Sequence, residues 1–120
     1  MRACLFLALI AISCHAGKKI TTQENLQETV KVSNDSPMDL IAKNDCYICH
    51  SFDRKLMGPS FNEIAKRYNG QKENIIGQLS DKIIKGGFGN WSDLPMTPHP
   101  KLSKPDAQTI VNFILSLKQS

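Results

Sequence analysis

Four segments between residue 36 and the carboxyl end of the chain place apolar residues on one side of a helix. The clearest segment runs from about Lys72 to Lys85, where apolar residues recur every three or four positions. Gly86 and Gly87 follow it, and glycine commonly ends a helix. No segment alternates apolar and polar residues as a half-buried strand does. The pattern therefore predicts an all-α domain.

Three of the predicted helices begin at a serine, whose hydroxyl can accept a hydrogen bond from an amide of the first turn. Ser36 and Ser103 each precede a proline and an acid within the first turn. Ser60 has Glu63 three residues later, which is the spacing of a capping box. The first helix is expected to run into Cys46. The last helix has an apolar stripe that is expected to pack against the first, formed by Ile110, Phe113, Ile114 and Leu117.

The segment Cys46-Tyr47-Ile48-Cys49-His50 has the C-x-x-C-H spacing that is typical of covalent attachment of a c-type haem. Cysteines three residues apart share one side of a helical turn, so Cys46 and Cys49 can each form a thioether with one haem vinyl group. His50 follows directly and would be the proximal ligand of the iron. A redox C-x-x-C lacks its usual preceding strand here, a zinc site lacks a second ligand pair, and a disulfide or a chance match is the remaining alternative. The motif predicts one covalent haem c.

A second axial ligand has to come from elsewhere in the chain. The candidates are the sulfur and imidazole side chains of Met38, Met57, Met96 and His99. Met57 is close to His50 in sequence, which is a short tether for reaching around the macrocycle. Met96 stands in a proline-rich loop far enough along the chain to cross to the other face. We expect Met96 as the distal ligand, with His99 as its rival.

The charge pattern bears on the partners. The formal net charge is +4 at pH 7, and the lysines are scattered rather than clustered with aromatic residues. No nucleic-acid partner is therefore expected. A domain of about 85 residues has a marginal core by itself, so a buried haem is expected to supply apolar surface and to couple folding to cofactor binding.

The amino-terminal residues have the form of an export signal. Arg2 precedes the apolar run 5–12, which is too short to span a bilayer. Cleavage is expected either before Cys14, which would then be lipidated and tether the protein to a membrane, or after Ala16. The protein is therefore expected to be exported, and to be periplasmic or membrane-anchored facing the periplasm.

The chain divides into three parts on this basis. Residues 1–16 form the signal peptide or lipoprotein signal. Residues 17–35 are polar and lack an apolar period, so they are expected to form a flexible linker. Residues 36–120 form the folded domain.

Residues 36 to 118 resemble the short bacterial class I cytochromes c of the cytochrome c-551 type. The residues that carry the resemblance are Cys46-Tyr47-Ile48-Cys49-His50, Met57-Gly58-Pro59, Gly89-Asn90-Trp91, Pro95-Met96 and Ser103. The resemblance implies a small class I cytochrome c fold, with four to five helices wrapped around one covalently bound haem. It implies His50 and Met96 as axial ligands, and a Pro59 carbonyl that accepts a hydrogen bond from the His50 ring. It also implies that the Trp91 indole donates to a haem propionate.

Three positions depart from the family's usual pattern. Lys82 stands where the family often has an arginine that pairs with a propionate, and an ammonium cannot form the bidentate contact of a guanidinium. His99 replaces an asparagine that commonly supports the loop of the distal ligand, and Phe113 replaces a tryptophan of the last helix. The first two departures bear on the reduction potential, whereas the fold is expected to be kept.

Imidazole and thioether ligands leave iron no open position, so the resemblance implies a one-electron carrier rather than an enzyme. Its partners would be a redox donor and acceptor such as a terminal oxidase or reductase, with the carrier itself a monomer. Lysines that could steer an acidic partner are Lys55, Lys85 and Lys101. The alternatives are a haem sensor, in which Met96 leaves to admit a small ligand, and an electron-transfer subunit of a larger oxidoreductase.

Overall fold

The computed structural model describes residues 32–71 and 74–117, which form five helices. In chain order these are α1 (Pro37–Lys43), α2 (Cys46–Cys49), α3 (Phe61–Tyr68), α4 (Asn74–Lys85) and α5 (Lys104–Leu115). Extended pairing within these ranges is limited to one isolated antiparallel bridge between Gly87 and Met96. The all-α prediction is confirmed. None of the helices in these ranges has the length and hydropathy needed to cross a membrane.

The serines predicted to start helices do so. Ser36 and Ser60 each form a complete capping box, in which the serine hydroxyl accepts from an amide of the first turn and the acid three residues on accepts from the serine amide. Ser103 caps α5 by accepting from the Asp106 amide at 3.2 Å. These contacts span three residues each, so they depend only on local sequence.

The first helix ends earlier than predicted. We expected it to run into Cys46, but α1 stops at Lys43, and Asp45 adopts a left-handed φ of 55°. The Asn44 side-chain amide donates to the Leu40 carbonyl at 2.8 Å and so satisfies one of the terminal acceptors of α1. The attachment motif consequently forms a separate single-turn helix, α2.

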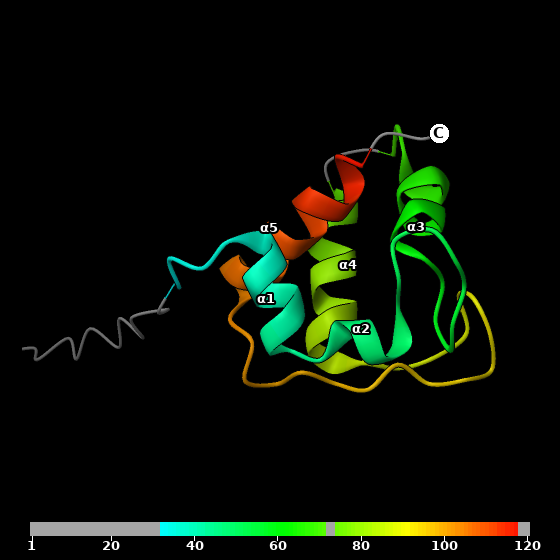
Figure 1. Ribbon diagram of the computed structural model, residues 1–120, viewed down its shortest axis with the longest axis horizontal. Coiled ribbons are helices and arrows are strands. Elements are labelled where there is room, and N and C mark those ends of the chain that lie inside the picture. Colours follow the sequence, from blue (N-terminus) through cyan, green and yellow to red (C-terminus); the bar gives the residue numbers. More distant parts are fainter. Residues whose placement is uncertain (1–31, 72–73, 118–120) are drawn as a thin grey trace, which may run out of the picture.

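Helix α5 lies at the centre of the core and contacts α1, α3 and α4 (Figure 1). Ile110 and Ile114 of its predicted stripe are buried, whereas Phe113 and Leu117 lie half-buried at the edge of the core. Ile41 of α1 is fully buried in the same cluster. The predicted packing of the last helix against the first is therefore present, and two further helices share it.

Residues just before α1 also contact the domain. The backbone amide and the hydroxyl of Ser33 donate to the Asp106 carboxylate at 3.1 and 3.0 Å. Asp35 forms an ion pair with Lys43 at 2.6 Å. These residues lie at the end of the segment that was expected to form the linker, and in the structure they contact the domain through these bonds. The export signal, Cys14 and the rest of the linker lie outside the described residues.

Candidate functional site

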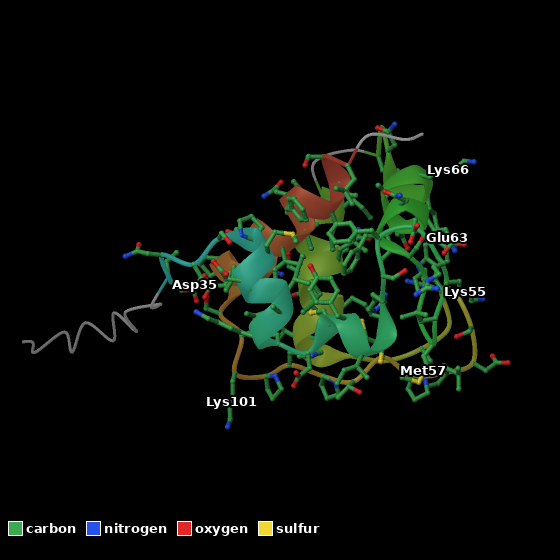
Figure 2. All side chains as sticks on the ribbon, viewed as in Figure 1. Asp35, Lys55, Met57, Glu63, Lys66 and Lys101 are labelled. Carbon is green, nitrogen blue, oxygen red and sulfur yellow. The ribbon has the colours of Figure 1, made fainter. Side chains whose placement is uncertain are left out.

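A cavity of about 690 Å³ separates the attachment segment from the loop that follows α4. One wall comes from residues 43–50 and 57–59, and the other from residues 87–102, with Lys82 reaching in from α4. Figure 1 shows α2 and this loop side by side along the lower edge of the molecule. Met57 and Lys101 mark the two ends of that edge in Figure 2, and both line the cavity.

Cys46 and Cys49 occupy the single turn of α2, and both line the cavity. Both are free thiols and half-buried, so the disulfide alternative does not describe this structure. Burial raises the pKa of the Cys46 thiol, which keeps it protonated at neutral pH. Two thiols on one helical turn face a cavity large enough for a flat, mostly apolar ligand.

The His50 ring is held in one orientation. Its Nδ1 lies 2.6 Å from the Pro59 carbonyl oxygen, as the family resemblance implied. A carbonyl only accepts, so Nδ1 carries the hydrogen and Nε2 keeps its lone pair for a metal. The ring stacks on Phe61 with 5.7 Å between centroids and 17° between planes. A Cβ on Gly58 would lie 2.5 Å from the ring's Cε1, so only glycine fits there.

Met96 lies on the opposite wall of the cavity. Its amide donates to the Gly87 carbonyl at 2.8 Å, and the Gly87 amide donates back to the Met96 carbonyl at 3.0 Å. Gly86 next to this bridge has a φ of 69°, and a Cβ there would lie 2.5 Å from the Met96 carbonyl oxygen. The glycines that end α4 therefore also allow the loop to approach closely.

The other candidate ligands have different surroundings. The Met38 sulfur accepts from the Tyr47 hydroxyl at 3.7 Å, away from the residues that line the cavity. Met57 lines the cavity mouth but is 53% exposed. His99 lines the cavity, and each of its ring nitrogens lies against a backbone carbonyl.

Lys82 and Trp91, the residues expected near the propionates, both line the cavity. Lys82 is half-buried, and its ammonium donates to the Phe88 carbonyl at 3.3 Å. Trp91 is half-buried beneath the guanidinium of Arg67, whose central carbon is 4.4 Å from the ring centroid. Arg67 also donates to the Asn90 carbonyl at 2.7 Å. Arg67 was not predicted, because no local pattern links a residue of α3 to a loop 24 residues later.

The lysines expected to steer a partner are all exposed but do not form one patch. Lys101 borders the cavity, whereas Lys85 lies 3.9 Å from Asp81 in an exposed pair along α4. Figure 2 shows Lys55 and Lys101 on different sides of the molecule. Charges dispersed in this way attract an acidic partner from a distance more than they stabilise one defined contact with it.

The side chains at the cavity fit a metal whose other ligands come from a bound cofactor rather than from the protein. Across residues 32–71 and 74–117, no three His, Cys, Asp or Glu side chains gather closely enough to hold a metal ion by themselves. The His50 imidazole and the Met96 thioether both line the cavity, together with the two thiols. This arrangement suits an iron porphyrin that is covalently attached on one side.

Comparison with known proteins gives matches over the same residues. A family model described as Cytochrome c matches residues 39–118. The chain is 41% identical over 80 residues to the cytochrome c-551 of Azotobacter vinelandii, which covers 67% of this chain and 95% of that protein. It is 38% identical over 80 residues to the cytochrome c-552 of Nitrosomonas europaea, covering 67% and 77%. The crystal structure of wild-type Nitrosomonas europaea cytochrome c552 aligns with a TM-score of 0.63 at 37% identity, over 68% of this chain and 99% of that one.

Proposed function

Because this chain belongs to the cytochrome c family, and is accordingly an electron carrier with one covalently attached haem c, we propose which of its residues bind the haem and how the electron is exchanged. Cys46 and Cys49 form the two thioether bonds. Bound haem supplies the one-electron couple between ferric and ferrous iron. The observation that carries the assignment is that both thiols, His50 and Met96 line a single cavity.

His50 is the proximal ligand in this proposal. The contact of 2.6 Å between its Nδ1 and the Pro59 carbonyl leaves Nε2 as the nitrogen that can bind iron. The hydrogen bond also raises the basicity of Nε2 and prevents rotation of the ring. Stacking on Phe61 limits tilting of the ring. A ligand held in this way changes position little when the charge on the iron changes, which favours rapid electron exchange.

Met96 is the distal ligand. His99 is less suited to bind iron, because both of its ring nitrogens contact backbone carbonyls. Met57 is more exposed than Met96, and Met38 is turned toward Tyr47. Thioether sulfur is a weak donor that disfavours ferric iron, so we expect a comparatively high reduction potential.

Trp91 and Lys82 contact the propionates. Both line the cavity, and the indole N–H and the ammonium are hydrogen-bond donors, as carboxylates require. Lys82 would exchange its present contact with the Phe88 carbonyl for a carboxylate. An ammonium makes a single, less directional contact than the guanidinium usual in the family, so Trp91 would do more of the orienting.

The carrier exchanges electrons with redox partners. We propose an exported, monomeric protein that accepts electrons from one periplasmic donor and delivers them to a terminal oxidase or reductase. Exposed lysines around the domain, such as Lys55 and Lys101, favour acidic partner surfaces. Mass spectrometry of the mature protein tests the export step, because its mass reports the cleavage site, the attached haem and any acyl chain on Cys14.

Replacement of the distal sulfur tests the assignment of Met96. We expect Met96→Ala to abolish the weak near-infrared sulfur-to-iron band of the oxidised protein. Met57→Ala is the matched control, because it removes the other methionine sulfur at the cavity and should leave the band unchanged. Persistence of the band in Met96→Ala, or its loss in Met57→Ala, would place the ligand elsewhere.

A further inference from the structure

The His99 side chain, in the loop that carries Met96, contacts two other parts of the chain. Its Nε2 lies 3.1 Å from the carbonyl oxygen of Asn44, just before the attachment motif. Its Nδ1 lies 3.3 Å from the carbonyl oxygen of Ile83, near the end of α4. The His99 backbone amide also donates to the Ile83 and Ile84 carbonyls, at 3.1 Å each. Residue 99 therefore connects the loop that carries Met96 both to the end of α1 and to the end of α4.

Both partners of the ring are acceptors. A neutral imidazole has one N–H and can donate to one of the two carbonyls, whereas a protonated ring donates to both. The two carbonyls belong to the C-terminal ends of α1 and α4, where helices carry partial negative charge and unsatisfied acceptors. The geometry around the ring therefore matches a doubly donating imidazolium.

Covalent attachment of haem would make the hydrogen bond from His99 to the Asn44 carbonyl more important. In the structure the Cys46 thiol also contacts the Asn44 carbonyl, with 3.8 Å between sulfur and oxygen. A thioether has no hydrogen to donate, so attachment removes this donor. The Asn44 carbonyl would then depend on His99 for its contact with a side-chain donor.

We propose that His99 is a positioning residue for the distal ligand, which clamps the Met96 loop to the attachment segment through both ring nitrogens when protonated and through only one when neutral. This inference rests on the proposed role of Met96. It would make the stability of the loop around Met96 depend on pH, which the side-chain amide of an asparagine or glutamine at this position could not do.

Several ionisable groups lie on the elements packed around the ring. They are Lys43 and Asp45 beside Asn44, Cys46 and Cys49 in α2, Asp81, Lys82 and Lys85 in α4, and Lys101 in the same loop. Each ring nitrogen contacts a carbonyl rather than one of these side chains. These charges can change the pH dependence of the loop without touching the ring, so a charge-removing variant is needed as a control.

The state of the ring can be measured directly in the reduced, haem-loaded protein. Nitrogen-15 shifts of the His99 imidazole, recorded from about pH 5 to 8, should show two N–H groups at the acidic end and one at the other end, because two carbonyls face the ring. A ring that carries one hydrogen throughout that range overturns the proposal. This measurement needs no variant and does not depend on which residue is the distal ligand.

The effect on Met96 can be measured as the rate at which cyanide displaces the distal ligand of the oxidised protein. The ionisation of cyanide also changes with pH, so the quantity compared is the ratio of the wild-type rate to the His99→Gln rate at each pH. We expect this ratio to rise roughly 2- to 10-fold across the same pH range, which is the change expected for loss of one hydrogen bond, and to approach one at the alkaline end. Lys85→Gln, which removes an exposed charge of α4 outside the cavity but not the bridge, should keep the wild-type profile.

Other outcomes separate the two proposals. Parallel pH profiles for the wild type and His99→Gln would mean that the pH effect comes from cyanide or from the propionates, which both measurements share, and would refute the role of His99. Absence of the near-infrared band from the wild type would instead refute Met96 as ligand. If His99→Gln does not accumulate, the nitrogen-15 titration of the wild type still decides the question.

Discussion

Gly58 is the residue whose enlargement should disturb the proximal side of the cavity most. An alanine Cβ at this position would lie 2.5 Å from Cε1, 2.9 Å from Nδ1 and 3.0 Å from Nε2 of His50. Gly58 does not have a positive φ, so the cost of alanine is steric rather than conformational. Gly58→Ala is therefore a test of how rigidly the His50 ring is held.

The magnitude follows from the space around the ring. Carbon atoms in contact normally lie about 3.5–4.0 Å apart, so the ring would have to move by about 1 Å. Such a shift strains the 2.6 Å contact with Pro59 or disturbs the stack on Phe61. Overpacking of this kind costs about 1–3 kcal/mol, or roughly 5- to 150-fold in the folding equilibrium constant.

Urea unfolding of the haem-loaded protein measures this cost, and the absorption spectrum of the oxidised form shows whether His50 remains bound. Gly77→Ala is the matched control, because its Cβ would meet only the Asn74 side-chain oxygen at 3.7 Å. Alanine within a helix should make the control equal to the wild type or up to about 1 kcal/mol more stable. If Gly58→Ala unfolds within about 0.5 kcal/mol of the wild type and keeps its spectrum, the ring is not held as described.

Two further substitutions test contacts outside the proximal pocket. Burial raises the pKa of Asp106, but hydrogen bonds from Ser103 and Ser33 outweigh it and hold the pKa below its usual value. Its carboxylate should therefore stabilise the fold above about pH 4 and lose that contribution as pH falls through the lower folded-state pKa, so the unfolding free energy of Asp106→Asn should depend less on pH in this acidic window. Equal pH slopes in urea titrations of the two proteins would contradict this account. Gly86→Ala should weaken the loop, because φ is 69° and the new Cβ would lie 2.5 Å from the Met96 carbonyl. Faster amide hydrogen exchange at Met96, at unchanged exchange in α1, is the expected result, and unchanged exchange at Met96 would argue against it.

The sequence by itself determined the features that depend on neighbouring residues. Ser36, Ser60 and Ser103 start helices because each hydroxyl meets an amide three residues later. The C-x-x-C-H spacing places two thiols on one turn for the same local reason. Family resemblance added the contact between His50 and Pro59, which the structure contains.

Tertiary structure decided the contacts between residues distant in sequence. The end of α1 before Cys46, the stack of Arg67 on Trp91 and the bond from Ser33 to Asp106 were not predicted. His99 shows the reason most clearly, because its partner Asn44 is 55 residues away. Such a contact exists only once α1, whose C-cap residue is Asn44, and α4 have both packed on α5, and no local pattern of residues records that arrangement.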